Sequence, residues 1–122
     1  MHNKCSVSLA RRRCLQALLL CSVSPGLFAR QPAGPRAVSL FQGATDSLAA
    51  LGVTPCGIVE SWTEKPVYRY LRSQLSGVPL LGLETQPALE KIVLLKPDII
   101  FASRFRHQDI APLMQKIAPV AL

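Results

Sequence analysis

Two arginines flank a phenylalanine in the segment 103–107, directly after the apolar run 98–102. A guanidinium group presents a planar fork of N–H donors that matches the oxygens of carboxylates and similar anions. Segments that follow a rigid strand often carry binding residues. Arg104 and Arg106 are therefore predicted to bind an anionic ligand; the alternative is that they are two solvated arginines beside a partly buried Phe105.

Other residues in predicted loops are candidates for the same site. Trp62 and Tyr68 combine apolar surface with a polar tip, so they are predicted to wall a pocket, or else to pack over the edge of the domain. Glu84 would repel a carboxylate-rich ligand but would accept a hydrogen bond from a hydroxyl or amine. His107 is interpreted as a loop residue rather than a ligand, and Cys56 as a small buried hydrophobe. The sequence has no Cys/His cluster spaced for zinc.

The elements that position these residues alternate along the chain. Apolar runs predict strands at 37–40, 57–60, 78–81, 98–102 and 119–122. Amphipathic spacing predicts helices at 44–51, 87–96 and 108–117, and the polar, aromatic segment 61–77 is expected to hold one irregular helix. Pro87 is expected at the first helical position after an N-cap at Gln86, and Pro97 is expected to end that helix. The residues predicted to face the core from these helices are Leu48, Leu51, Leu89, Ile92, Val93, Ile110, Leu113, Met114 and Ile117.

This alternation predicts an α/β domain, a parallel sheet flanked by helices and joined by right-handed crossovers. In such sheets ligands bind beyond the carboxyl ends of the strands. The loops at 41–43, 61–62, 83–85 and 103–107 all leave such ends. They are expected to converge on one edge of the sheet.

The segment from Gly82 to Ile100 carries the pattern G-x-x-x-Q-P-x-L-E-x-I-x-x-L-K-P-D-I-I. This pattern resembles the N-terminal lobe of the periplasmic iron–siderophore and vitamin B12 binding proteins of ABC importers, above all the ferric-citrate and ferric-hydroxamate members. The resemblance covers residues 36–122 and implies a Rossmann-like lobe of a two-lobed protein. It implies a monomer that holds a ferric chelate between the lobes and needs no cofactor and no metal ligand of its own, since the chelator holds the iron.

The resemblance also implies roles for two acidic residues. Glu90, in the P-x-L-E part of the pattern, would dock onto arginines of the ABC permease; the alternative is a solvated carboxylate that stabilises the first turn of its own helix. Glu84 stands where ferric-citrate and ferric-hydroxamate members often carry arginine. This departure weighs against ferric citrate as the ligand.

The first 29 of the 122 residues resemble an export signal, with a basic start, the short apolar stretch 14–23 and a possible cleavage site at Ala29. Residues 30–35 are interpreted as a linker. The run Arg11–Arg13 fits either the general secretory route or the twin-arginine route, and both predict a periplasmic protein. Four of the 14 basic residues lie in this leader, so ten remain against seven acidic ones. That balance leaves no basic stripe for nucleic acid.

Three alternatives stay open at this point. An enzyme is disfavoured because the sequence lacks a G-x-G-x-x-G motif, a P-loop and a G-x-S-x-G elbow. A truncated remnant that cannot bind ligand is a second reading, because the sequence stops within the strand predicted at 119–122. A relative that binds vitamin B12 or haem is the third, with Trp62, Tyr68 and Phe105 beside the macrocycle.

Overall fold

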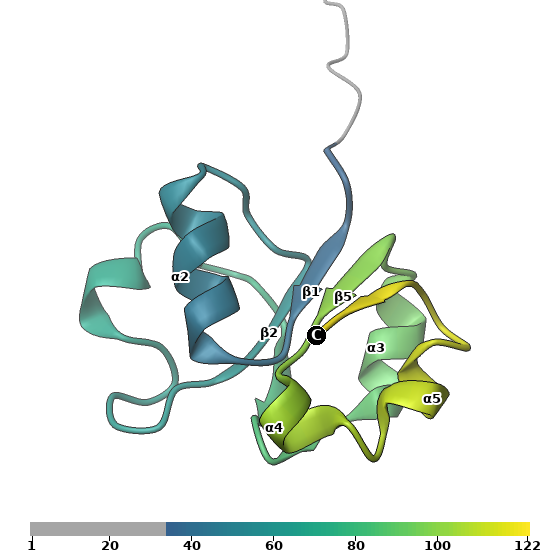
Figure 1. The fold of residues 1–122 in the computed structure, drawn as a ribbon. Helices are drawn as coiled ribbons and strands as arrows, with labels where there is room; N and C mark the ends of the chain where they lie inside the picture. Colours follow the sequence, from purple (N-terminus) through teal and green to yellow (C-terminus); the bar gives the residue numbers. More distant parts are fainter. Residues whose placement is uncertain (1–33) are drawn as a thin grey trace, which may run out of the picture. The chain divides into compact units, whose positions relative to one another are not determined.

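The computed structural model describes residues 34–122, in which strands and helices alternate (Figure 1). The predicted export signal and most of the predicted linker lie outside these residues. In chain order the elements are β1 (Ala37–Ser39), α2 (Gln42–Ala50), β2 (Gly57–Glu60), the 3₁₀ turn η1 (Arg69–Leu71), β3 (Leu80–Leu83), β4 (Gln86–Pro87), α3 (Leu89–Leu95), β5 (Ile99–Phe101), α4 (Arg104–His107), α5 (Ala111–Met114) and β6 (Val120–Ala121).

The strands described form one sheet in the order β4-β3-β2-β1-β5-β6. The five adjacent strands β3-β2-β1-β5-β6 are parallel to one another, as predicted. The chain builds the sheet outward from β1 to β3 and then returns to place β5 on the other side of β1. This reversal makes the carboxyl ends of β1 and β5 the switch point at which ligands bind in open α/β sheets.

One strand departs from the predicted parallel sheet. Gln86 and Pro87 form the antiparallel edge strand β4, which pairs with Leu83 and Gly82 of β3. The chain can turn back there because Gly82 has a φ of 93°, a backbone conformation that residues other than glycine rarely adopt. The N-cap and first turn predicted at these residues are therefore wrong, and α3 begins at Leu89 after Ala88.

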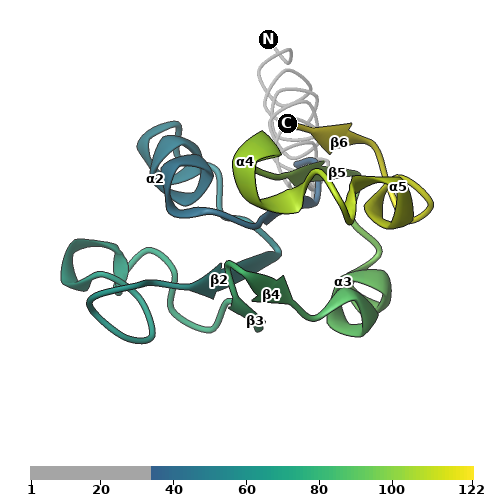
Figure 2. The same cartoon turned by 60° about the horizontal axis from the view of Figure 1, so that its bottom comes forward.

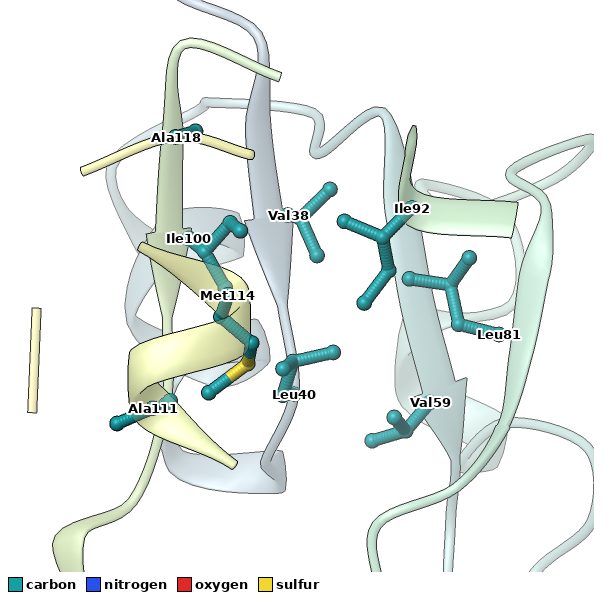
Figure 3. Packing of buried hydrophobic residues seen from close by; sticks show 10 residues of the cluster. Val38, Leu40, Val59, Leu81, Ile92, Ile100, Ala111, Met114 and Ala118 are labelled. Atoms are coloured by element: carbon teal, nitrogen blue, oxygen red, sulfur yellow. The ribbon is translucent and has the colours of Figure 1, made fainter. Parts of the chain in front are cut away.

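Each face of the sheet has its own apolar cluster, because successive strand residues point to opposite faces. Ile58 packs with Leu71 and Leu75 on the face that α2 covers. Val59 belongs to the cluster on the face of α3 and α5, and Figure 2 shows these helices on the opposite side of the sheet from α2. This second cluster is centred on Val38, Leu40, Leu81, Ile92, Ile100 and Met114 (Figure 3).

Close contacts of Leu95 hold the end of α3 against the sheet. The Cβ of any side chain at Gly57 would lie 2.6 Å from Cδ1 of Leu95, so glycine allows α3 to approach β2 closely. The backbone carbonyl of the same Leu95 accepts hydrogen bonds from Arg36 Nε and Nη2 at 3.0 and 2.8 Å. Lys96 adopts the left-handed conformation with a φ of 47°, and Pro97 follows, so the helix ends where the sequence predicts.

The helices predicted at 87–96 and 108–117 are shorter than predicted, α2 ends before Leu51, and several predicted core residues are exposed. Val93, Leu51 and Leu113 are 52%, 77% and 49% exposed, whereas Ile92 and Met114 are fully buried. A helix of seven residues such as α3 makes only two turns and buries one residue fully. The predicted helix 108–117 is reduced to α5, and the predicted loop 103–107 contains the single turn α4.

These positions give a direct test of the packing. Ile92→Val removes one methylene from a fully buried side chain and is expected to lower the free energy of unfolding by about 0.5–1.5 kcal/mol. The matched control is Val93→Ala on the same helix. Because the Val93 side chain is half-exposed, this truncation should change the free energy of unfolding by about 0.5 kcal/mol or less. Urea denaturation measures both. Equal losses for the two variants would contradict the packing of α3.

Candidate functional site

The carboxylate of Glu84 is the centre of the polar contacts at the carboxyl edge of the sheet. Glu84 lies in the turn between β3 and β4 and is only 8% exposed. Its Oε2 accepts a hydrogen bond from Trp62 Nε1 at 3.0 Å. Its Oε1 lies 2.8 Å from Arg106 Nε. Both oxygens are thus matched, as a buried carboxylate requires.

Arg106 also stacks on Trp62. The guanidinium carbon lies 4.9 Å from the centre of the indole ring, within cation–π range. Trp62 follows β2, Glu84 follows β3 and Arg106 is on α4 after β5, so three strand ends contribute to one group of contacts. We call this group the Trp62–Glu84–Arg106 cluster. The sequence-based prediction that these loops converge is confirmed at these residues.

The ring of His107 links the backbone of Ser103 to that of Glu84. Its ring is fully buried, and Nδ1 accepts the backbone N–H of Ser103 at 2.9 Å. Nδ1 therefore carries no proton, and Nε2 must donate to the carbonyl of Glu84, 2.7 Å away. The interpretation of His107 as a loop residue is wrong, because the segment closes into the helical turn α4 and turns the ring inward. No local pattern in the sequence indicated this turn.

A hollow of about 260 Å³ lies beside the cluster. Trp62 and Leu83 give it apolar walls, and Glu84 borders it with its matched carboxylate. Lys65 also borders the hollow, and its Nζ is paired with Glu60 Oε2 at 2.8 Å. The other residues that line the hollow are Glu60, Ser61 and Thr85.

Tyr68 belongs to a separate network. Its ring stacks on Tyr70 with a centroid distance of 5.7 Å, and its backbone N–H donates to Ser61 Oγ at 3.2 Å. The hydroxyl of Tyr70 donates to Asp46 Oδ1 at 2.9 Å, and this bond raises the pKa of the Tyr70 phenol. Tyr68 does not line the hollow, and its predicted place in a ligand pocket stays a prediction.

The other predicted site residues lie on exposed surfaces. Arg104 is exposed on α4, and neighbouring Phe105 is 86% exposed, with its ring centre 5.8 Å from the Arg106 guanidinium carbon. Glu90 is exposed on the first turn of α3, outside the cluster.

Cys56 is partly buried just before β2, and this burial raises the pKa of its thiol.

The cluster can present donors to an anion. In the hydrogen bonds and ion pairs of residues 34–122, Arg106 uses Nε alone, which leaves Nη1 and Nη2 for a ligand. Glu84 balances the positive charge of Arg106, and Arg104 supplies a further positive charge on α4. Within those residues, no group of three His, Cys, Asp or Glu side chains is placed to hold a metal ion. None of the helices described there has the length and apolar composition that a membrane crossing requires.

No protein-family model matches the sequence. The achromobactin-binding periplasmic protein of Dickeya dadantii is 67% identical over 87 residues, which cover 71% of this chain and 28% of that protein. The Fe(3+) dicitrate-binding periplasmic protein FecB of Escherichia coli is 37% identical over 97 residues, covering 80% of this chain and 32% of that protein. The crystal structure of Staphylococcus aureus SirA complexed with staphyloferrin B superimposes with a TM-score of 0.70 and 44% identity, covering 75% of this chain and 31% of that one.

The predicted resemblance is confirmed. This chain is similar to the siderophore-binding proteins over one α/β lobe, and further matched proteins are named as siderophore-binding. The predicted fold class is confirmed as well, with the antiparallel edge described above. The matched proteins are named for binding and not for an enzymatic reaction, as expected. The chain spans about a third or less of the length of the relatives described.

The ion pair between the partly exposed Arg106 and the buried Glu84 can be tested through its energetic coupling. Arg106→Leu leaves the Glu84 carboxylate buried without its cation, so this change should cost more stability than it does in the background Glu84→Gln. The double-mutant cycle, measured by urea denaturation, is expected to give a coupling energy of about 0.5–3 kcal/mol.

The exposed pair Lys65–Glu60 is a matched control. Its N–O distance is also 2.8 Å, but its side chains are 52% and 30% exposed, compared with 34% and 9% for Arg106 and Glu84. Exposed pairs typically couple by about 0.2–1 kcal/mol. If the Arg106–Glu84 cycle shows no coupling, or less than the control, the pair does not hold the cluster together.

Proposed function

We propose that this chain forms one ligand-binding wall of a siderophore-binding protein that serves an ABC importer, and that it contacts an anionic ferric chelate through the Trp62–Glu84–Arg106 cluster. The observation that carries the proposal is the position of Arg106, which Glu84 and Trp62 hold at the carboxyl edge of the sheet while its Nη groups bond to none of residues 34–122. A guanidinium that is already oriented loses less entropy when it binds an anion. The similarity to proteins named for siderophores and ferric dicitrate supports the same ligand class.

Glu84 has a positioning role in this proposal. Both of its oxygens are engaged by Trp62 and Arg106, so its charge is matched before a ligand arrives. An acidic residue can therefore stand beside an anion site without repelling the ligand. The objection to ferric citrate raised by an acid at this position is correspondingly weaker.

The size of the hollow fits one wall of a larger cleft. At about 260 Å³ it is smaller than most ligand pockets, which measure about 300–1,000 Å³. Trp62 and Leu83 would contact the chelate backbone, while Arg106 and Arg104 would contact its anionic oxygens. The chelator would hold the iron, so no protein ligand to the metal is needed.

Vitamin B12 or haem is the less favoured ligand. That alternative needs Trp62, Tyr68 and Phe105 around one macrocycle. In the structure Tyr68 stacks on Tyr70 instead and lies outside the lining of the hollow. The charge of Arg106 and Arg104 favours the anionic chelate.

The remaining parts of the proposal concern location and delivery. Relatives are named as periplasmic proteins, and the export signal predicted at residues 1–29 would give this chain a periplasmic location. Glu90 would dock onto the permease, since its carboxylate is exposed on α3 and takes no part in the cluster. The protein would act as a monomer.

The ligand role of Arg106 is testable in a chimaera. Residues 34–122 would replace the matching segment of the Dickeya dadantii protein, and calorimetry would measure its affinity for ferric achromobactin. The chimaera should bind, and Arg106→Gln should weaken binding about tenfold or more, because a charge-assisted hydrogen bond contributes about 1.5–3 kcal/mol.

Lys116→Gln is the control for loss of charge alone, since Lys116 is exposed and lies outside the cluster. It should leave the affinity unchanged. A folded chimaera that does not bind, or equal affinities for the Arg106 and Lys116 variants, would refute the proposed site. Melting curves establish folding in each case.

The docking role of Glu90 predicts a separation of binding from uptake. In the same chimaera, Glu90→Gln should leave the chelate affinity unchanged and lower iron uptake by cells that depend on this protein. Asp109→Asn removes an exposed charge from another part of the chain and should leave uptake unchanged. Normal uptake with Glu90→Gln would rule out docking through Glu90.

A further inference from the structure

We propose that Gln42 is a positioning residue of the ligand site. Its side-chain amide joins the start of α2 to Ser61 and thereby holds the next residue, Trp62, in place for the ligand. This inference rests on the proposed function for its ligand. The conformational part concerns this chain alone and is tested without a ligand.

Asp46 sets the orientation of the Gln42 amide. An ionised carboxylate only accepts hydrogen bonds, and Asp46 Oδ1 accepts from Gln42 Nε2 and from the Tyr70 hydroxyl, each at 2.9 Å. With its nitrogen directed to Asp46, Gln42 presents its amide oxygen as an acceptor, 3.3 Å from Ser61 Oγ. The amide is therefore oriented by a residue four positions along its own helix before it meets the loop after β2.

Ser61 needs the Gln42 oxygen because its side chain is withdrawn from water. The residue is 2% exposed, and within residues 34–122 its hydroxyl proton bonds to the Gln42 oxygen alone. The hydroxyl oxygen accepts the backbone N–H of Tyr68 at 3.2 Å, and the backbone N–H of Ser61 donates to the Pro66 carbonyl at 3.0 Å. Ser61 thus closes the loop 61–68 on itself, and Gln42 ties the closed loop to α2.

Trp62 follows Ser61 directly, so its backbone leaves the sheet from a point that Gln42 helps to fix. Its indole N–H donates to Glu84 Oε2 at 3.0 Å, and the Arg106 guanidinium carbon lies 4.9 Å from the ring centre. The residue is 56% exposed, so burial alone does not hold the ring there. Trp62 is thus held from two sides, by the helix after β1 and by the ends of β3 and β5.

An indole that is held in this way gives an anionic chelate a preformed wall. Binding must otherwise order the side chain, and order that is already present in the free protein lowers that cost. Gln42 is not among the residues that line the hollow, so its effect on affinity passes through Ser61 and Trp62. Loss of its hydrogen bonds is expected to weaken chelate binding about two- to tenfold, with the Arg106 guanidinium still present.

Two substitutions break the link in different ways. Gln42→Met keeps an unbranched side chain of similar length but removes the amide donor and acceptor. Gln42→Glu replaces the amide nitrogen by an oxygen, which faces Asp46 acceptor against acceptor. Adding Asp46→Asn to Gln42→Glu returns a donor between these two side chains and leaves the other oxygen at position 42 to accept from Ser61. This double variant is the rescue.

Thr45→Val is the matched control on the same helix. The buried Thr45 hydroxyl bonds to Ser39 Oγ at 2.8 Å and to the Phe41 carbonyl at 3.3 Å. Its loss disturbs the start of α2 and lowers stability without removing a hydrogen bond to the loop 61–68. A variant that only destabilises the fold should therefore leave Trp62 in place.

The indole N–H signal of Trp62 reports the outcome in the ligand-free full chain, where it is the single signal of its kind. Its chemical shift in nuclear magnetic resonance depends on the hydrogen bond to Glu84, and Glu84→Ala gives the shift of an indole without that acceptor. Gln42→Met and Gln42→Glu should move the signal toward this reference. The rescue variant and Thr45→Val should keep it near the wild-type position.

The proposal is overturned if both single Gln42 variants keep the wild-type signal, if Thr45→Val moves it as far, or if Asp46→Asn fails to restore it in Gln42→Glu. Calorimetry on the chimaera with the Dickeya dadantii protein adds the affinity for ferric achromobactin. Gln42→Met should bind about two- to tenfold more weakly than Thr45→Val, and equal affinities would also overturn the proposal. If the chimaera binds no chelate while the indole signal follows the expected pattern, the positioning of Trp62 stands and only the proposed function fails.

Discussion

A carboxylate that is almost fully withdrawn from water must be matched by donors, and Glu84 imposes this constraint on the whole site. Its two oxygens draw Trp62 from the end of β2 and Arg106 from the turn after β5. Its backbone carbonyl meets the ring of His107. The position of the Arg106 guanidinium therefore depends on partners from the ends of two other strands, β2 and β3.

The topology explains why these residues can meet. The chain places β3 and β5 on opposite sides of β1 and β2, yet all of these strands are parallel, so their carboxyl ends share one edge. The two apolar clusters hold α2 on one face and α3 and α5 on the other, which leaves that edge to polar side chains. The similarity to siderophore-binding proteins extends over this lobe, so the same edge is the natural place for the ligand contacts proposed here.

Residue patterns were sufficient to predict the alternation of strands and helices, the limits of β2 and the convergence of the loops that carry Trp62, Glu84 and Arg106. They were insufficient where burial depends on distant partners. Val93 and Ile92 are adjacent apolar residues in α3, and only the covering sheet decides which of them is buried. Likewise, the pairing of Glu84 with Trp62 spans 22 residues, and the burial of His107 follows from a turn that no local pattern indicated.

The central claim is that an anionic metal chelate contacts the Trp62–Glu84–Arg106 cluster. Nuclear magnetic resonance with gallium(III) citrate, a diamagnetic substitute for the ferric chelate, tests it most directly. The chain has a single indole N–H, so its signal can be followed without ambiguity beside that of Arg106 Nε–H. The account predicts that both signals shift together and saturably as the chelate is added. If the chelate binds while both signals stay in place, the ligand lies elsewhere and the account is wrong.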